Sequence, residues 1–338
     1  MKEYIKFIDL FCGIGGFHQA FTALGVKCVF ACDYDKYARE TYAANYGVKP
    51  YSDIREVSPH DIEDFDILCA GFPCQPFSLA GVSKKNSLGH KHGFEDEKQG
   101  NLFFEILRIV QEKHPKIMFL ENVKNLKSHD KKNTWRVIKE GLVSNGYYVF
   151  HKIIDAACYV PQHRERIFIV CFDKNIFPDI DFEFPKEPSK RVSELKDVID
   201  EKADMKYTLS DKLWQYLQKH KENSEKKGNG FGFGLVDLEK DEITRTMSAR
   251  YYKDGSEILI KQESANPRRL TPDEARRLFG YPDNFIIPVS DCQAYKQFGN
   301  TVVVPAIKHT AERILKTVEE YQNGGARVTF IQESLWAV

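Results

Sequence analysis

The 338-residue sequence contains no long apolar run. None approaches the roughly 18 residues that a membrane-spanning helix needs. The first residues, MKEYIKFIDLF, lack the basic leader and apolar stretch of a secretory signal. The eight cysteines form no CxxC pair and the ten histidines no HExxH spacing, so neither a disulfide framework nor a metal site is indicated. We therefore expect a cytoplasmic protein with reduced cysteines and no metal.

Neither sign of charge is in excess. Lysine and arginine together number 49, and so do aspartate and glutamate. The overall balance therefore does not indicate a nucleic-acid partner, and local clusters have to decide. Such clusters occur, but lysine-rich stretches are also typical of solvated helix faces. The hydrophobic content of 42% is enough for a large core.

Strand-like apolar runs alternate with helix-period segments from residue 4 to about 172. This alternation predicts an α/β fold, with a doubly wound and mostly parallel sheet that has helices on both faces. After Pro178 the chain becomes richer in proline, charge and glycine, which predicts a smaller, loop-rich domain. We expect the large domain to comprise 1–185 plus 294–325, the small domain 186–293, and a tail 326–338.

Two features mark the return from the small domain to the large one. Thr271 is followed by Pro272 and Glu274, which is the pattern of a helix that begins with a capping box, and Gly280 ends it. The stretch AYKQFGNTVVVPAIKHTAERIL predicts a turn, a short apolar run and a closing helix.

A glycine-rich turn follows the first predicted strand in FIDLFCGIGGF. Gly13, Gly15 and Gly16 would let the backbone approach a nucleotide-like ligand, and Asp33, after the next strand, could accept hydrogen bonds from a ribose. A dinucleotide fingerprint needs glycine where His18 stands. The turn therefore favours an adenosine ligand without a pyrophosphate, such as S-adenosylmethionine. A tight structural turn is the alternative.

Further reactive side chains lie at the ends of other predicted strands, and the arginines among them precede their strand. Cys74 lies between two prolines in GFPCQPFS, Glu121 follows an apolar run in KIMFLENV, and Arg164 and Arg166 alternate in QHRER. The carboxyl ends of parallel strands share one edge of the sheet, so these groups would converge there. A buried apolar cysteine and a solvated strand terminus are the ordinary alternatives.

Six motifs, in order, resemble those of the DNA cytosine-5 methyltransferases, particularly the small bacterial restriction-modification type. The resemblance covers about residues 4 to 315, with 180–265 weakly matched. The motifs are FCGIGG, GFPCQPFS, ENV, QHRER, RRLTPDEARRLFGYPDNF and YKQFGNTV.

The resemblance implies a Rossmann-like, S-adenosylmethionine-dependent catalytic domain and a target-recognition domain. Cys74 matches the thiolate that adds to carbon 6 of a cytosine flipped out of the duplex. Glu121 matches the group that hydrogen-bonds or protonates ring N3. Arg166, with Arg164 as support, matches the arginine pair that holds the cytosine O2 and nearby backbone. The methyl group would pass from S-adenosylmethionine to carbon 5, leaving S-adenosylhomocysteine, with no metal required.

The resemblance also implies contacts with the cofactor, and the residue types indicate contacts with DNA. The cofactor contacts fall on Phe11, Gly13, Ile14, Gly15, Gly16, Asp33, Tyr34, Asp53, Ile54, Phe72, Pro73, Leu102, Asn300 and Val302. The DNA contacts are expected from the residue types of the catalytic loop and of the weakly matched region, at Ser78, Lys84, Lys85, Arg245, Thr246, Arg250 and Tyr251, and Thr246-Met247 resembles a pair typical of the family. A long insertion at 83–98 in the catalytic loop is predicted either to contact phosphates or to be a solvated loop.

The expected partner is double-stranded DNA with a short specific site. We expect a monomer in a bacterial cytoplasm, associated with the nucleoid and paired in function with an endonuclease without a stable complex. A tRNA methylase is less favoured, because that branch carries a CFT-containing stretch that is absent here. The full set of reactive residues argues against an inactive DNA-binding relative, and His18 against a Rossmann oxidoreductase.

Overall fold

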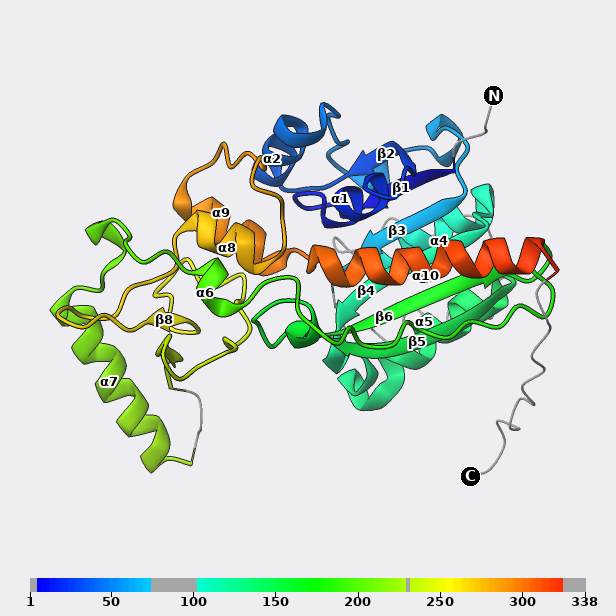
Figure 1. Ribbon diagram of the computed structural model, residues 1–338. Helices are drawn as coiled ribbons and strands as arrows, with labels where there is room; N and C mark the ends of the chain where they lie inside the picture. Colours follow the sequence, from blue (N-terminus) through cyan, green and yellow to red (C-terminus); the bar gives the residue numbers. More distant parts are fainter. Residues whose placement is uncertain (1–4, 74–101, 229–231, 325–338) are drawn as a thin grey trace, which may run out of the picture.

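The computed structural model describes residues 5–73, 102–228 and 232–324. A six-stranded sheet in the order β2-β1-β3-β4-β6-β5 forms the centre of the large domain (Figure 1). Its strands are β1 (Lys6–Leu10), β2 (Lys27–Cys32), β3 (Ile67–Gly71), β4 (Ile117–Val123), β5 (Tyr147–Asp155) and β6 (Glu165–Asp173). Every neighbouring pair is parallel except those of β6, which runs antiparallel to both β4 and β5. The predicted strands are all present.

Both faces of the sheet are buried, as the continuous apolar runs of its strands require. Phe7 and Cys69 point to one face and Ile8 and Leu68 to the other, because successive side chains of a strand alternate. The first face packs against α1 (Gly16–Thr22) and α10 (Val304–Gln322), and the second against α4 (Leu102–Lys113) and α5 (Asn133–Ser144). α2 (Lys36–Tyr46) follows β2. The doubly wound α/β prediction is confirmed.

The smaller region lies at one end of the sheet, where α7 projects from it (Figure 1). A small apolar cluster of Leu209, Leu217 and Leu259 lies within it, but Met247 and Tyr251 belong to the same buried cluster as the sheet's first face. Its elements are α6 (Leu195–Val198), α7 (Asp211–Lys226), β7 (Leu235–Val236), β8 (Leu259–Ile260) and α8 (Pro272–Leu278). α9 (Asp291–Asn300) crosses the predicted boundary at residue 293, and its buried apolar residues belong to the cluster of the sheet's first face. Short 3-10 helices are η1 (Ile54–Glu56), η2 (Pro59–Asp61), η3 (Lys124–Lys127), η4 (His129–Lys132), η5 (Ala156–Cys158) and η6 (Met205–Tyr207).

The two local predictions in the returning segment differ in outcome. The capping box is confirmed, since Thr271 Oγ1 accepts from the Glu274 amide at 3.1 Å and the Glu274 carboxylate accepts from the Thr271 amide at 2.7 Å. The turn predicted from Ala294 is wrong, because these residues lie in α9. Ala294 and Phe298 are buried at helical spacing, and Gly299 lies near the helix end rather than in a turn. Within the described ranges, no helix has the length and apolar character to cross a membrane.

Candidate active site

A hollow of about 440 Å³ lies at the carboxyl ends of β1, β3 and β4. This is the edge at which open α/β sheets bind ligands. Twelve residues singled out from the sequence line it: Phe11, Gly13, Ile14, Asp33, Tyr34, Phe72, Pro73, Leu102, Glu121, Arg164, Arg166 and Asn300. Eight others complete the lining: Asp35, Ala38, Gly71, Asn122, Val123, Lys296, Gln297 and Gly299.

The glycine turn forms one wall of this hollow, and its conformation requires glycine. Gly13 and Gly15 have φ of +53° and +83°, in the left-handed region that other residues rarely adopt. A Cβ on Gly15 would lie 2.2 Å from the Tyr46 ring, and one on Gly16 2.4 Å from Val302. Gly15 and Gly16 therefore serve the packing behind the turn.

Asp33 joins this turn to the end of β2. Its carboxylate accepts hydrogen bonds from the amides of Gly13 at 2.7 Å and Asp35 at 2.8 Å. Burial raises the pKa of Asp33 above its ordinary value, and these two amides act in the opposite direction. A carboxylate offers about four acceptor positions, so two amides leave capacity for a ligand hydroxyl.

Glu121 and Arg166 form an ion pair in the same hollow. They come from the neighbouring strands β4 and β6, and Arg166 Nε lies 3.1 Å from Glu121 Oε1. Burial raises the pKa of the Glu121 carboxyl, while the positive charges of Arg166 and Arg164 oppose that shift. The site therefore holds a carboxyl group with a raised affinity for a proton beside a fixed positive charge.

Asn122 is a site residue to which sequence reasoning assigned no role. Its side-chain amide donates to the Phe72 carbonyl at 2.8 Å, which ties the end of β4 to the end of β3. Phe72 lies two residues before Cys74, and Cys74 itself lies outside the described residues. The signal for Asn122 was its place directly after Glu121 at a strand end.

Arg164 makes contacts of a different kind from those of Arg166. Its Nη1 donates to the Met247 carbonyl at 2.9 Å, and its Nη2 donates to the carbonyls of Gly299 and Thr301 at 3.0 and 2.7 Å. The side chain is buried and lies over the Phe279 ring. Burial lowers the pKa of Arg164 to about 9, so the guanidinium stays charged at neutral pH.

The sequence matches a family of known proteins. The family described as C-5 cytosine-specific DNA methylase matches residues 5–316. The chain belongs to this family. It is 50% identical to the Type II methyltransferase M1.ScrFI of Lactococcus lactis subsp. cremoris, over 93% of this chain and 79% of that protein. It is also 50% identical to the Type II methyltransferase M.NlaX of Neisseria lactamica, over 91% of this chain and 96% of the relative.

Solved structures show the same fold at lower sequence identity. The Entamoeba histolytica methyltransferase EhMeth superposes with a TM-score of 0.71 at 19% identity, covering 94% of this chain and 99% of that one. The S. pombe Dnmt2 methyltransferase gives the same TM-score at 18% identity, covering 93% and 99%. The α/β fold of S-adenosylmethionine-dependent methyltransferases is therefore confirmed.

Some positions predicted from the methylase family do not line the hollow. Asp53 caps η1 and forms an ion pair with Arg55 at 2.5 Å, and Ile54 lies in the core. Gly15, Gly16 and Val302 lie behind the lining. These positions support the walls of the hollow rather than face it.

Some of the predicted DNA-contacting residues of this methylase line a hollow and others do not. Arg245, Thr246 and Arg250 line a second hollow of about 600 Å³ together with His163 and Lys253. The expectation for Tyr251 is not met, because its side chain is fully buried. Its hydroxyl donates to the Ile258 carbonyl at 2.7 Å and accepts from the Leu270 amide at 2.8 Å. Ser78, Lys84, Lys85 and the insertion 83–98 lie outside the described residues.

Proposed function

We propose that this chain is a site-specific methyltransferase that modifies carbon 5 of cytosine in double-stranded DNA with S-adenosylmethionine. Family membership supports C5 methylation of cytosine in DNA. The observation that carries the finer proposal is the Glu121–Arg166 pair, which lies in one hollow with Asp33 and the glycine turn. One cavity thus offers groups suited to a pyrimidine and groups suited to an adenosine.

The residues at the glycine-turn end fit S-adenosylmethionine. Phe11, Ile14, Phe72 and Leu102 supply apolar surface, and Asp33 supplies an acceptor for ribose hydroxyls. When bound, the cofactor supplies the methyl group that cytosine C5 accepts, and it leaves as S-adenosylhomocysteine.

The chain's own residues activate the cytosine ring, because C5 alone is a poor nucleophile. The Cys74 thiolate adds to C6, and the electron pair of the C5–C6 double bond moves into the ring. Burial raises the pKa of Glu121, which favours transfer of a proton from this carboxyl group to ring N3, and Arg166 donates a hydrogen bond to O2. After C5 is methylated, its hydrogen leaves as a proton to a base. The double bond re-forms as the Cys74 thiolate departs, and ring N3 returns its proton to Glu121.

The reaction requires the cytosine to leave the helix stack and enter the hollow, at a cost of a few kcal/mol. The second hollow, lined by Arg245, Thr246 and Arg250, offers donors for guanine edges and phosphates. We propose that the enzyme acts as a monomer and protects host DNA from a cognate endonuclease.

Bisulfite sequencing of DNA from cells that express the protein tests this function. Wild-type protein is expected to leave the cytosines of one short site unconverted, and Cys74→Ser to leave none. Cys292→Ser is the matched control, because Cys292 is exposed and does not line the hollow, so this variant should methylate as the wild type does. Complete conversion in all three samples would disprove the proposal.

A further inference from the structure

Two segments far apart in the sequence are joined by hydrogen bonds beside the hollow. One is 161–164, directly before β6, and the other is 244–247, in the recognition region; we call this pairing the interlock. Thr246 Oγ1 also donates to the His163 carbonyl. The other bonds are Thr244 N to Pro161 O at 2.9 Å, Thr244 Oγ1 to Pro161 O at 3.2 Å, His163 N to Thr244 O at 2.9 Å, Met247 N to Gln162 Oε1 at 2.9 Å and Arg164 Nη1 to Met247 O at 2.9 Å.

Arg164 extends the interlock to the rim of the hollow. Its Nη2 holds the carbonyls of Gly299 and Thr301, on either side of Asn300, which lines the hollow. One planar guanidinium thus connects the recognition segment, through Met247, to the wall of the active site. A lysine ammonium has no planar fork and could not reach all three carbonyls in this geometry.

The cost of this arrangement argues that it has a purpose beyond packing. Among the described residues, the Arg164 guanidinium has three carbonyl partners and no carboxylate in ion-pair contact. A buried charge without a counter-ion is expensive, and an apolar residue of similar volume would pack at lower cost. Arg166, in contrast, is paired with Glu121, although both arginines line the hollow.

We propose that Arg164 is a positioning residue that couples DNA-sequence recognition to the active site, and that it does not itself contact the cytosine. It holds segment 244–247, with Arg245 and Thr246, in register with the pocket that receives the flipped base. A correct site therefore seats the cytosine in place, and loosening the interlock reduces discrimination between sites. This inference rests on the proposed methyltransferase function.

Three variants test the proposal on purified full-length protein. Arg164→Lys and Gln162→Ala each loosen the interlock. The first changes a charged side chain, and the second removes a neutral side chain that does not line the hollow. Arg166→Lys changes the pocket itself. The site found by bisulfite sequencing is presented as a duplex, alongside a duplex with one base pair changed outside the target cytosine. For each variant, kcat/KM on both duplexes, the pH–rate profile and the melting temperature are measured.

Both interlock variants are expected to lower the preference for the correct duplex about tenfold, equivalent to ~1.4 kcal/mol, with the pH profile of the wild type. Arg166→Lys should slow both duplexes equally and keep the preference. The proposal is overturned if Arg164→Lys slows both duplexes equally while Gln162→Ala behaves as wild type, since Arg164 would then act on the base. It is also overturned if both interlock variants keep the wild-type preference.

Two further readings complete the test. If Arg164→Lys does not fold, as its melting temperature would show, Gln162→Ala alone decides, since it removes one neutral acceptor. A wild-type protein that methylates neither duplex would count against the proposed function rather than against the interlock.

Discussion

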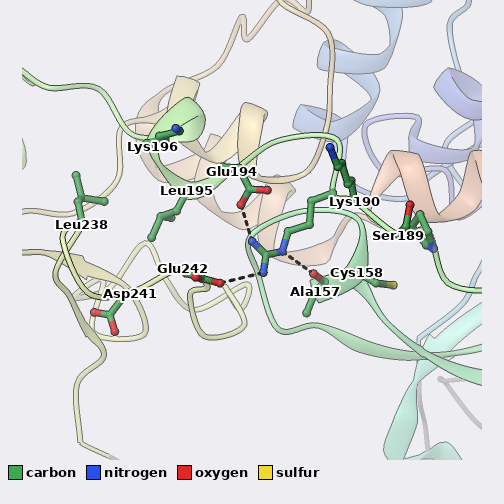
Figure 2. Close-up of a pocket in the computed structure, with 12 residues that line it drawn as sticks. Ala157, Cys158, Ser189, Lys190, Glu194, Leu195, Lys196, Leu238, Asp241 and Glu242 are labelled. Atoms are coloured by element: carbon green, nitrogen blue, oxygen red, sulfur yellow. Dashed lines mark hydrogen bonds and ion pairs between the residues drawn. The ribbon is translucent and has the colours of Figure 1, made fainter.

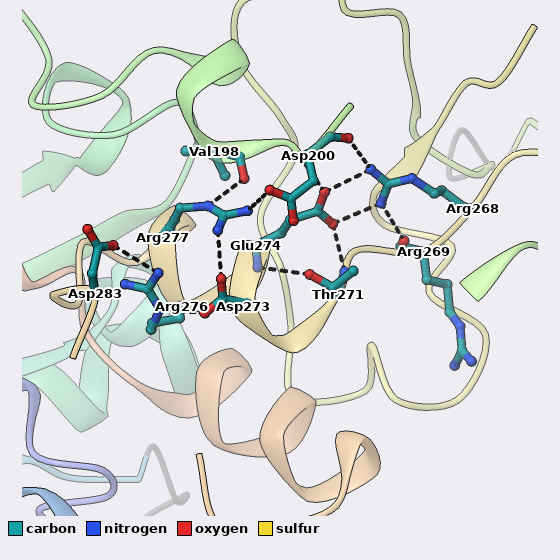
Figure 3. A network of polar contacts seen from close by, with 10 residues as sticks. All are labelled: Val198, Asp200, Arg268, Arg269, Thr271, Asp273, Glu274, Arg276, Arg277 and Asp283. Atoms are coloured by element: carbon teal, nitrogen blue, oxygen red, sulfur yellow. Dashed lines mark hydrogen bonds and ion pairs between the residues drawn. The ribbon is translucent and has the colours of Figure 1, made fainter. Parts of the chain in front are cut away.

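The positive charges of two buried arginines in this protein are stabilised by different kinds of partner. Arg268, in the segment leading to α8, meets Glu274 through both Nη atoms at 2.8 Å, and the two side chains are 4% and 0% exposed (Figure 3). Arg164 is equally buried but has carbonyl partners instead of a carboxylate. The first arrangement neutralises its charge, whereas the second leaves a net positive charge beside Glu121.

The difference follows from what surrounds each arginine. The Glu274 carboxylate also accepts from the amides of Thr271 and Asp200, so the pair closes a joint between α8 and the chain after α6. Arg164, in contrast, donates to three carbonyls in two other segments, so its guanidinium holds backbone in place instead of neutralising a carboxylate. The Arg268–Glu274 pair therefore stabilises the packing of α8, whereas Arg164 positions the segments beside the hollow.

The largest effect on stability is expected from removing the ion pair between Arg268 and Glu274. Glu274→Gln removes the counter-ion and leaves Arg268 buried with its charge unpaired, so we expect a loss of about 3–5 kcal/mol in the free energy of unfolding. Denaturant titration followed by circular dichroism measures it. The rate of methylation per folded molecule should stay close to that of the wild type, since neither residue lines the hollow.

The matched control is Glu140→Gln in the exposed pair that Glu140 forms with Arg136 at 2.8 Å on α5. Both side chains are more than half exposed, so removing this carboxylate should cost about 0.5 kcal/mol or less. Equal losses for the two variants would contradict the distinction between a buried joint and a surface pair.

A second effect concerns the active site itself. Glu121→Gln keeps the shape of the side chain but removes its acidic proton, so the rate of methylation should fall about 100-fold or more. Single-turnover methylation at several pH values measures it. The wild-type rate should decline as pH rises through the raised pKa of Glu121, and that decline should be absent in the variant.

The raised pKa of Glu121 also predicts in which direction stability changes with pH. Because its pKa is higher in the folded protein, protonation favours the folded state, and the resulting stability is present below the unfolded pKa and lost as pH rises through the folded pKa. The wild type should lose stability across that window relative to Glu121→Gln. If the wild-type rate and the wild-type stability both showed the same pH dependence as Glu121→Gln, Glu121 would not titrate in this pH range.

Much of the fold could be predicted because its signals are local. The six strands are continuous apolar runs, and the capping box at Thr271 lies within four residues. The lining of the hollow also follows from strand ends, since Asp33 and Glu121 lie at carboxyl ends of strands as predicted. Arg166 lies at the amino end of β6 and reaches the same edge because β6 runs antiparallel to β4.

The remaining features depend on partners distant in sequence. The hydrogen bonds of Arg164 join residues 83, 135 and 137 positions apart in the sequence. No local pattern therefore shows that its Nη atoms already donate to backbone carbonyls. Tyr251 looks like a surface aromatic between Arg250 and Lys253, yet its hydroxyl bonds to backbone groups that only the tertiary fold brings close. The sequence assigned Arg164 a supporting role but could not show which backbone groups it holds, because those groups lie in distant segments.

Among the arginines compared, the smallest effect is expected at Arg191, whose partners are one carbonyl and two carboxylates. Arg191 borders a separate hollow of about 660 Å³ (Figure 2). Its Nε donates to the Ala157 carbonyl at 3.0 Å, and its Nη atoms lie 2.6 Å from Glu194 and 3.6 Å from Glu242. Both carboxylates are at least half exposed, so water competes for them.

Arg191→Ala should therefore cost about 1 kcal/mol or less in the free energy of unfolding, measured by the same denaturant titration. The preference between correct and altered duplexes should stay at the wild-type value, because Arg191 holds no atom of segment 244–247. A loss as large as that of Glu274→Gln would mean that exposure of the carboxylate does not set the strength of these pairs. A changed preference would mean that recognition is transmitted through contacts outside the interlock.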